Sequence, residues 1–230
     1  MVLVGTSGFS YTEWKGIFYP EDLSSKKYLW YYSQRFHTTE INNTFYRLPT
    51  LKLTEGWYGE VPDDFSFTLK LSQKITHIRR LKNCDEEMNV FLNAAAALKH
   101  KLGPILVQLP PNLKKNTEVL SDFLSKYAAK GKLAFEFRND SWFDEEVYDL
   151  LREHNTTLGV VEKEDGTEPV REVTGSFVYM RLRKGDYEGA ELMEWARWIR
   201  SQTADVYCYL KHDEKAPVLA TALVEALKSI

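Results

Sequence analysis

A carboxylate and a guanidinium stand two residues apart in the middle of the chain, at Glu136 and Arg138. Within residues 132–142 apolar and polar side chains alternate, which predicts a strand with aromatic residues on one face and these charges on the other, about 7 Å apart where they leave the backbone. A strand with a charged face that leads into a loop and then a helix, here residues 144–152, is typical of an α/β barrel. The alternative is a Glu–Arg pair that only neutralises itself inside the protein.

Polar side chains also stand late on the other expected strands. They are Glu40 and Asn42, Lys70, Gln108, Glu162 or Lys163, Tyr179 and Arg181, and Tyr209 and Lys211. In a barrel the carboxyl ends of all strands meet at one mouth, so these groups would converge there. Burying each charge without a partner is costly, and a set of charges on successive strands therefore favours a functional mouth.

The residue types in this ring suggest an acid–base pair beside an anion site. We expect Glu136 to act as general acid or base and Glu40 as its partner carboxylate, with the pKa of one raised and that of the other lowered. Cations outnumber carboxylates, which favours a phosphate, a carboxylate or a nucleic-acid backbone as ligand. The three cations of the substrate site would clamp the anion, and its two amides would orient the substrate. The expected substrate-binding residues are Lys70, Arg138, Arg181, Asn42, Gln108, His77, Tyr11, Trp14, Tyr46, Trp142 and Tyr209.

Two other functions are compatible with the same residues. Glu40 and Glu136 would also serve as the carboxylate pair of a glycoside-cleaving or other sugar-processing enzyme. A non-catalytic module that binds a nucleotide or single-stranded nucleic acid is the second alternative. Residues 9–20 are dense in aromatic side chains, which would stack on bases or sugar rings, or would instead close the barrel end as a plug.

Ligand spacing does not indicate a metal cofactor, although a divalent metal is compatible with the chain. A site built from His77, His212 and a Glu is conceivable, and loop or surface positions are the simpler interpretation of these histidines. The two cysteines, Cys84 and Cys208, lie far apart and show no zinc-ligand spacing.

Strand and helix patterns alternate along the chain, which predicts a parallel sheet. Strands are expected at residues 2–5, 38–46, 65–72, 105–109, 132–138, 157–162, 177–183 and 206–211. Helices are expected at 24–36, 50–60, 85–99, 117–129, 144–152, 187–202 and 216–228, and residues 73–81 are expected to form a loop. Eight such units predict a compact (β/α)8 TIM-like barrel, irregular because the helix between the sixth and seventh strands is missing.

The composition fits one globular domain over residues 1–230, with 43% hydrophobic and 27% charged residues. The net charge of −3 requires neither nucleic acid nor a membrane as partner. The first residues lack the basic and apolar regions of a signal peptide, and no apolar run is as long as a membrane span. We therefore expect a cytoplasmic protein.

Several short motifs, in order, resemble those of the YecE-like family, a prokaryotic group of barrel proteins of unknown function. They are Gly5-Thr-Ser-Gly-Phe-Ser-Tyr11, Trp14, Phe18-Tyr-Pro20, Glu40-Ile-Asn-Asn-Thr-Phe-Tyr46, Leu48-Pro49, Lys70, Thr76-His77, Gly103-Pro-Ile-Leu-Val-Gln-Leu-Pro-Pro111, Phe135-Glu-Phe-Arg138 and Ser141-Trp142. The last third departs from the family pattern, with Arg181-Leu-Arg-Lys-Gly185 in place of an Arg-x-His-Gly-like segment and Leu210-Lys-His212 in place of an aromatic-Asn-Asn stretch. The resemblance implies a TIM-barrel-like fold and a suggested likeness to barrel endonucleases that act on DNA.

Taken together, these patterns predict a barrel hydrolase or lyase, in the manner of a phosphodiesterase. The substrate is expected to carry phosphate, with nucleic acid included, and to bind at the carboxyl-terminal mouth of the barrel.

Overall fold

The structure is a computed structural model that describes residues 1–164, 167–211 and 214–230. Its strands are β1 (Val2–Ser7), β2 (Thr38–Ile41), β3 (Ser66–Lys70), β4 (Leu102–Gln108), β5 (Leu133–Glu136), β6 (Thr157–Leu158), β7 (Val160–Val161), β8 (Phe177–Leu182) and β9 (Asp205–Leu210). Its α-helices are α1 (Tyr28–Ser33), α2 (Asn43–Tyr46), α3 (Leu51–Glu60), α4 (Asp85–Ala96), α5 (Thr117–Tyr127), α6 (Glu145–Glu153), α7 (Gly189–Ser201) and α8 (Ala216–Lys228). Short 3₁₀ turns lie at Thr12–Trp14, Ser25–Lys27, Lys99–Lys101, Ala128–Lys130 and Asp140–Trp142.

All strand pairs are parallel, and the sheet runs in the order β6-β5-β4-β3-β2-β1-β9-β8-β7. The two ends of this order, β6 and β7, are consecutive in the chain and are separated by Gly159 alone. The expected sixth strand is thus split, because β6 pairs with β5 whereas β7 pairs with β8. The Gly159 N–H donates to the Phe135 carbonyl at 2.8 Å, and a Cβ at Gly159 would lie 3.1 Å from that oxygen.

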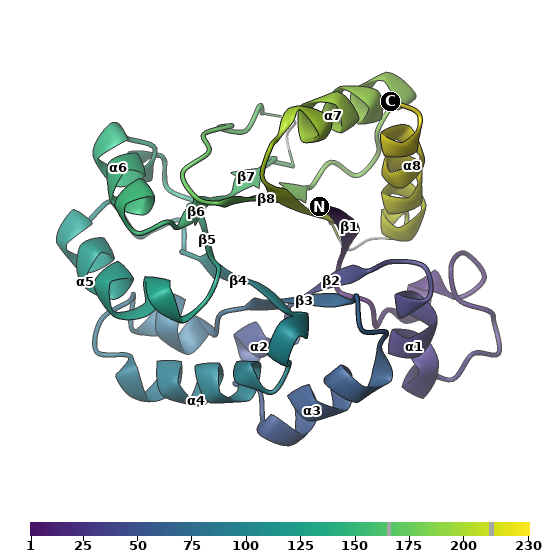
Figure 1. Ribbon diagram of the computed structural model, residues 1–230, viewed down its shortest axis with the longest axis horizontal. Coiled ribbons are helices and arrows are strands. Elements are labelled where there is room, and N and C mark those ends of the chain that lie inside the picture. The colour runs from purple at the N-terminus through teal and green to yellow at the C-terminus, as the bar shows by residue number, and fades with distance from the viewer. Residues whose placement is uncertain (165–166, 212–213) are drawn as a thin grey trace.

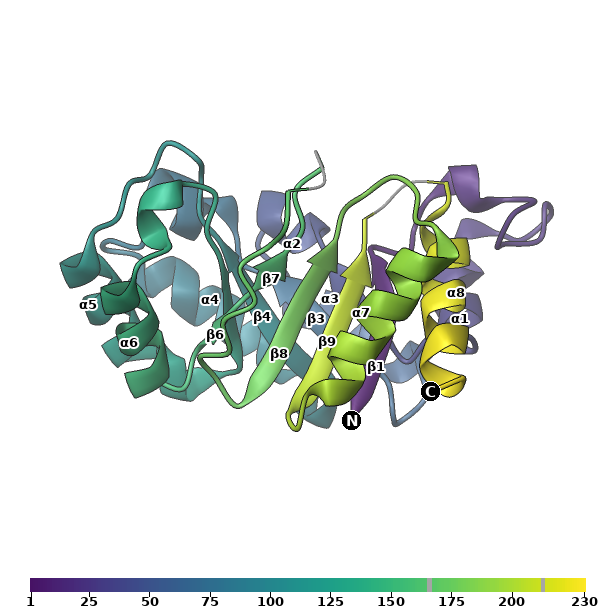
Figure 2. The same ribbon diagram turned by 90° about the horizontal axis from the view of Figure 1, so that it is seen from above.

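The sheet therefore wraps into a nearly closed barrel with helices around it (Figure 1). This confirms the predicted TIM-like α/β fold, and the described part of the interval between β7 and β8 contains no helix, as expected. In the side view the arrowheads of β8 and β9 point to the same edge, where the carboxyl ends of the strands meet (Figure 2).

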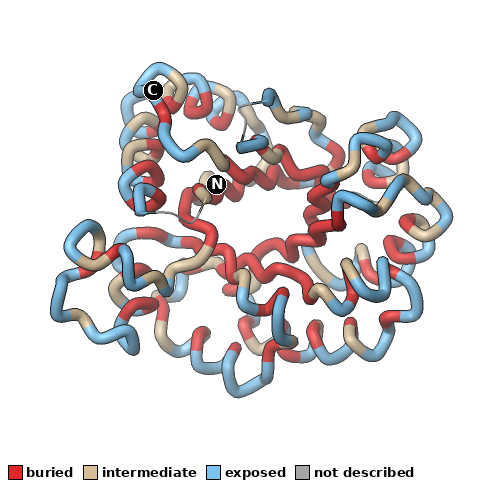
Figure 3. The backbone as a smooth tube through the Cα atoms, turned by 180° about the vertical axis from the view of Figure 1, so that it is seen from behind, coloured by how far each residue is buried: buried red, intermediate tan, exposed pale blue. Residues whose placement is uncertain are grey.

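The helices cover the barrel with their apolar faces. In α5 the buried side chains are Leu120, Phe123, Leu124 and Tyr127, a spacing that places them on one face of a helix. The Asn116 side chain accepts from the Val119 N–H at 3.0 Å and caps this helix. Figure 3 shows the result, with buried strands in the middle and exposed residues on the outer sides of the helices.

The inside of the barrel has its own small apolar cluster, separate from the larger core between sheet and helices. It consists of Leu106, Ala134, Phe177, Tyr179, Tyr207 and Tyr209, with Leu3 packed against it. Polar contacts begin within this interior, where the Tyr209 hydroxyl lies 2.8 Å from Thr38 Oγ1 and 2.7 Å from Thr68 Oγ1. At the carboxyl ends of the strands the interior is polar, with Lys70, Gln108 and Glu136 as the last residues of β3, β4 and β5. The apolar cluster thus forms a floor beneath a polar mouth.

Besides the split sixth strand, three expected elements have other boundaries or another conformation in the structure. The strand expected over residues 38–46 ends at Ile41, because α2 begins at Asn43 and the Thr44 hydroxyl bonds to the carbonyls of Ile41 at 3.1 Å and Lys70 at 2.7 Å. The loop expected at 73–81 contains a π-helical turn over Lys74–Ile78. The first strand continues to Ser7 instead of ending at Gly5.

Within the described ranges, no helix is both long and apolar enough to cross a lipid bilayer.

Candidate functional site

Arg181, near the end of β8, connects the two carboxylates that the sequence singles out. Its Nη1 donates to Oε2 of Glu136 at 2.6 Å, and its Nη2 donates to Oε1 of Glu40 at 2.9 Å. All three side chains are buried, with 8% of Arg181, 1% of Glu136 and none of Glu40 exposed. The two carboxyl groups are therefore held one guanidinium width apart at the base of the mouth.

Glu40 on β2 is fully buried, and both of its carboxylate oxygens accept hydrogen bonds. Ser7 donates to its Oε1 at 2.5 Å and Asn42 does so at 3.1 Å, while the Tyr179 hydroxyl donates to its Oε2. Burial alone would raise the pKa of Glu40, but Arg181 and the hydrogen bonds from Ser7 and Tyr179 outweigh that cost, and the pKa is lowered.

Glu136 at the end of β5 is held in the same way. Gln108 donates to its Oε1 at 2.7 Å and Arg138 does so at 3.0 Å, and Arg183 lies 3.7 Å from the same oxygen. Burial opposes the charge, but Arg181 and then Arg138 stabilise it and lower the pKa of Glu136 to about 2. The expected division, with one carboxyl pKa raised for a general acid, is therefore absent: both carboxyl groups are ionised at neutral pH.

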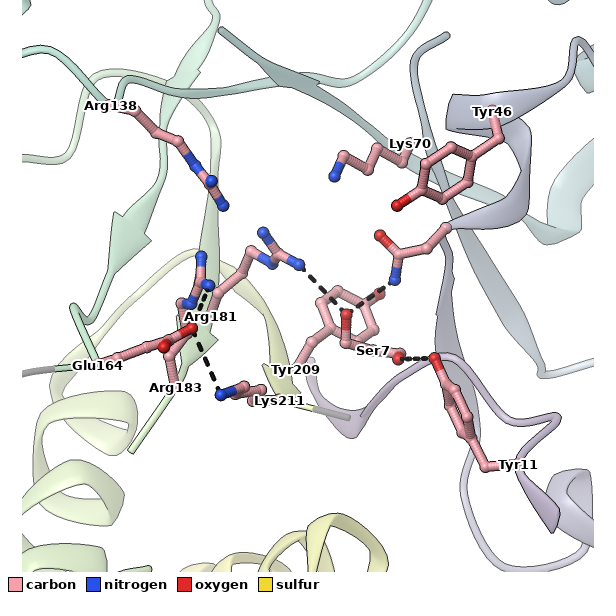
Figure 4. Close-up of a pocket in the computed structure, with 11 residues that line it drawn as sticks. Ser7, Tyr11, Tyr46, Lys70, Arg138, Glu164, Arg181, Arg183, Tyr209 and Lys211 are labelled. Atoms are coloured by element: carbon pink, nitrogen blue, oxygen red, sulfur yellow. Dashed lines mark hydrogen bonds and ion pairs between the residues drawn. The ribbon is translucent and has the colours of Figure 1, made fainter. Parts of the chain in front are cut away.

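A cavity of about 270 Å³ opens above this buried cluster, at the carboxyl ends of the strands. Its lining residues are Ser7, Tyr11, Asn42, Tyr46, Lys70, Arg138, Glu164, Arg181, Arg183, Tyr209 and Lys211. Figure 4 shows the cationic groups on several sides of this space, which we call the mouth cavity. Five of the lining side chains are cationic and one, Glu164, is a carboxylate.

The cations of the mouth cavity differ in how far they are already neutralised. Arg183 lies 2.7 Å and Lys211 lies 3.4 Å from the Glu164 carboxylate, and Arg181 is fixed between the buried carboxylates. Arg138 reaches Glu136 through Nε alone and keeps 37% of its side chain exposed. Lys70 Nζ lies 4.2 Å from the centre of the Phe45 ring. Among the described residues it forms neither a hydrogen bond nor an ion pair. Arg138 and Lys70 are thus the cations most available to a ligand.

Seven of the thirteen predicted site residues line the mouth cavity. They are Tyr11, Asn42, Tyr46, Lys70, Arg138, Arg181 and Tyr209. Glu40, Glu136 and Gln108 lie below it as the buried support of Arg181. Asn42 reaches the cavity from the turn before α2 and not from a strand.

Besides Gln108, three predicted ligand-binding residues lie outside the mouth cavity. Trp14 is fully buried and packs against Tyr11, with ring centroids 4.9 Å apart, so it supports the rim from behind. Trp142 is 1% exposed, stacks on Phe137 at 4.8 Å and donates from its ring to a backbone carbonyl. His77 packs edge-on against the Phe45 ring at 4.9 Å and is not among the residues that line the mouth cavity.

Four residues that line the mouth cavity are absent from the thirteen predicted site residues: Ser7, Glu164, Arg183 and Lys211. Of these, Lys211 was expected among the polar side chains late on the strands. Ser7 was missed because the sequence pattern predicts a first strand that ends at Gly5. The pairing of Ser7 with Glu40 in the sheet shows that the strand continues. Arg183 follows Arg181 by two residues, so the alternation that identified Arg181 also indicates Arg183. Glu164 lies in an irregular segment where no periodic pattern marks it.

A second cavity, of about 550 Å³, adjoins the first and shares Arg138, Glu164 and Arg183 with it. Its other lining residues include the apolar side chains of Pro111, Phe137, Phe143, Val161, Pro169 and Val170. We call it the side cavity. The two cavities together offer a cationic compartment next to a largely apolar one.

In residues 1–164, 167–211 and 214–230 no group of three or more His, Cys, Asp and Glu side chains is arranged to hold a metal ion. His212, which the conceivable His77–His212 site requires, lies outside the described residues. The contribution of the divergent Leu210-Lys211-His212 end is therefore described only for its first two residues.

The fold and length of the chain agree with those of solved structures. A DUF72 family protein of Thermotoga maritima matches with a TM-score of 0.84 and 30% identity, and the match covers 99% of each chain. A DUF72 family protein of Enterococcus faecalis matches with a TM-score of 0.82 and 20% identity over 99% of this chain and 96% of the other, a likeness of fold alone.

Sequence relatives point to the same group of proteins. UPF0759 protein YunF of Bacillus subtilis (strain 168) is 28% identical over 157 residues, which are 65% of this chain and 55% of YunF. UPF0759 protein YecE of Escherichia coli (strain K12) is 27% identical over 146 residues, or 62% of this chain and 50% of YecE. The chain thus spans about half the length of the curated relatives that it matches. Residues 3–229 match the family described as "Protein of unknown function DUF72", so the resemblance to YecE-like proteins is confirmed and the chain belongs to the DUF72 family.

Proposed function

We propose that the mouth cavity binds the phosphate group of a small substrate and that the protein is a hydrolase or lyase acting on it. The observation that carries this proposal is the charge of the lining, with five cations and one carboxylate around about 270 Å³. A concentration of fixed cations in a concave site favours an anion, and arginine side chains suit the oxygens of phosphate. Because Glu40 and Glu136 already neutralise part of Arg181, Arg138 and Lys70 would make the strongest contacts with the ligand.

The side cavity supports a substrate with two parts. An anionic head in the mouth cavity would place the rest of the molecule against Phe137, Phe143 and Val161, and Arg138 would lie between the two compartments. Small-molecule sites commonly combine such an apolar surface with a few polar anchors. A phosphorylated sugar or nucleoside has these two parts.

The buried carboxylates have a positioning role in this proposal. A glycoside-cleaving enzyme needs one carboxylic acid that is still protonated when it meets its substrate. Both Glu40 and Glu136 have lowered pKa values, and neither lines the mouth cavity, although Glu136 borders the side cavity. Their ionised state argues against the sugar-processing alternative. We propose that they hold the Arg181 guanidinium in one orientation.

A thermal-shift panel tests the proposal. It would compare phosphate, sugar phosphates, nucleotides, neutral sugars and short oligonucleotides. Phosphate and phosphorylated ligands are expected to raise the Tm of the wild-type protein. The expected gain is smaller for Arg138→Gln and unchanged for Arg152→Gln. Arg152 is a matched control because it too is paired with carboxylates and has 36% of its side chain exposed, against 37% for Arg138.

The panel also separates the alternatives. A Tm that responds to neutral sugars and to no anion would overturn the phosphate proposal and favour sugar chemistry. Nucleic acid as the natural ligand would show as binding to oligonucleotides whose affinity falls steeply with salt, since each neutralised backbone phosphate releases counterions. The cytoplasmic location stays a prediction, for which cell fractionation is the measurement.

A further inference from the structure

Lys70 is a buried lysine whose amino group is left to the mouth cavity. It ends β3, 9% of the residue is exposed, and its Nζ lies 4.2 Å from the centre of the Phe45 ring. Throughout the described part of the chain no carbonyl, hydroxyl or carboxylate oxygen bonds to this nitrogen. Figure 4 shows the side chain directed into the cavity on the side that faces Arg138.

Another buried lysine, Lys101, shows how this protein normally satisfies such a group. Lys101 is 3% exposed, and its Nζ donates to the carbonyls of Tyr58 at 3.0 Å and Val61 at 2.8 Å. Within the mouth cavity itself, Lys211 lies 3.4 Å from the Glu164 carboxylate. Lys70 alone among these three lacks an oxygen partner in the described structure, although burial makes an unpartnered ammonium costly.

The surroundings of Lys70 lower the pKa of its amino group and so increase the fraction present as neutral amine. Burial lowers its pKa first, and Arg181 adds to the effect. Glu40 and Glu136 raise the pKa and Arg138 lowers it, and the result is a pKa of about 8. Arg183, Lys211 and the Glu164 carboxylate line the same cavity, and His77 lies near enough that burial and the charge of Lys70 together lower the pKa of its imidazole. A lysine that is desolvated beside other cations keeps a nucleophilic fraction near neutral pH.

We propose that Lys70 is the nucleophile of the mouth cavity and forms a Schiff base with the carbonyl group of a small phosphorylated aldehyde or ketone. This inference rests on the proposed function and refines it for one class of substrate. Inorganic phosphate would contact Arg138 and Lys70, whereas a phosphorylated carbonyl compound would leave its phosphate with Arg138, beside Arg181, and bring its carbonyl carbon to Nζ. The nitrogen forms a bond to that carbon, and the carbonyl oxygen leaves as water with the two amine hydrogens. No oxidant or reductant is needed. The protonated imine then accepts the electron pair of a neighbouring bond. When a C–C bond breaks, the other fragment leaves as a carbonyl compound and its hydroxyl proton goes to water; when a C–H bond breaks, the proton goes to water. This favours lyase over hydrolase chemistry.

Reductive trapping tests the proposal on the wild-type protein. Glyceraldehyde 3-phosphate would be added with cyanoborohydride, which reduces an imine to a stable secondary amine, and the modified lysines would be identified by peptide mass spectrometry. Lys70 is expected to be labelled at least about tenfold faster than Lys211 or Lys101 near pH 8, because those two amines are bound to oxygens. Unphosphorylated glyceraldehyde should label Lys70 more slowly, and inorganic phosphate should compete.

A substitution distinguishes this inference from the proposed function. Lys70→Arg retains the positive charge, so the phosphate-induced rise in Tm should persist while labelling at position 70 is lost. If phosphate stabilises the wild-type protein but Lys70 is labelled no faster than Lys211, the Schiff base is overturned and the phosphate site remains. If phosphate neither stabilises the protein nor slows the labelling, the proposed function itself fails, and with it this inference.

Discussion

Nη1 of Arg181 lies 2.6 Å from Oε2 of Glu136, and neither side chain has more than a tenth of its surface exposed. In such a pair each charge depends on the other, because removal of one partner leaves the other buried without compensation.

Glu136→Gln is therefore expected to destabilise the fold. The substitution leaves Arg181 with Glu40 as its remaining carboxylate, and we expect a loss of about 3–5 kcal/mol in the free energy of unfolding. Urea titration measures this loss. Glu164→Gln is the control, since that carboxylate is 57% exposed and its removal should cost about 1 kcal/mol or less. Equal free energies of unfolding for the two variants would show that the buried cluster stabilises the fold no more than an exposed ion pair does.

Acid should weaken the protein through the same residue. The pKa of Glu136 is about 2 in the folded state against the ordinary 4.5 of a glutamate, so the folded protein binds this proton less tightly than the unfolded chain does. The corresponding stability, on the order of 3 kcal/mol, is present above about pH 4.5 and is lost as the pH falls toward 2. Unfolding titrations at several pH values should show this slope in the wild type and a shallower slope in Glu136→Gln.

Lys70 should lower the stability of the unliganded protein. Its folded-state pKa of about 8 lies below 10.5, so its charge opposes folding at neutral pH, and the cost disappears as the pH rises from about 8 to 10.5. Lys70→Met is expected to raise the free energy of unfolding at pH 7 by about 1–3 kcal/mol and to weaken phosphate binding. Denaturation and phosphate titration of the same samples measure both effects. A destabilised Lys70→Met protein would contradict this account.

Phosphate binding should also decline with rising pH. The ligand for this test is a phosphate monoester, whose second pKa of about 6 leaves its charge nearly constant above about pH 7.5, whereas Lys70 loses its proton around pH 8. The affinity of the wild type is expected to fall between pH 7.5 and 9.5, and that of Lys70→Arg is expected to stay level. Calorimetric titration at fixed ionic strength would show the difference, and parallel curves would exclude Lys70 from the ligand contacts.

The aromatic residues near the mouth should divide into two groups. Tyr46 is 71% exposed at the rim, so Tyr46→Ala should change stability by no more than about 0.5 kcal/mol while it reduces the affinity for a phosphorylated ligand. Trp14 is fully buried behind Tyr11, and Trp14→Ala should cost about 3–5 kcal/mol. Thermal unfolding with and without ligand separates the two effects. If Trp14→Ala were as stable as the wild type but no longer bound the ligand, Trp14 would be a ligand contact and not a structural support.

Much of the barrel could be predicted from the sequence because two-residue and helical periodicities alternate along the chain. The stretch around Glu136 is an example, since the strand and the helix after it lie close to the expected positions. The strand predicted over residues 38–46 is too long, because β2 ends at Ile41. Polar and apolar residues go on alternating there, but the chain turns where the Thr44 hydroxyl bonds to the Lys70 carbonyl, a contact between distant residues that no local pattern contains.

For the site, the sequence indicates which residues meet but not how they share their charges. Glu40, Glu136 and Arg181 were each expected at the mouth, and their arrangement as one buried bridge depends on the register of three strands. The same holds for Trp14, whose residue type suits a ligand platform and a buried support equally well. Only its position behind Tyr11 decides between the two.

The buried cluster of Glu40, Arg181 and Glu136 at the base of the mouth also affects the order in which the protein folds during its synthesis on the ribosome. Arg181 follows Glu136 by 45 residues and Glu40 by 141, so both carboxylates leave the ribosome well before the cation that joins them. A nascent chain that ends before β8 cannot bury Glu40 against this guanidinium, and the early strands gain little from closing around an uncompensated charge. Arrival of β8 and β9 therefore completes the charge cluster and the ring of strands together, which couples the folding of the amino-terminal half to the synthesis of these two strands.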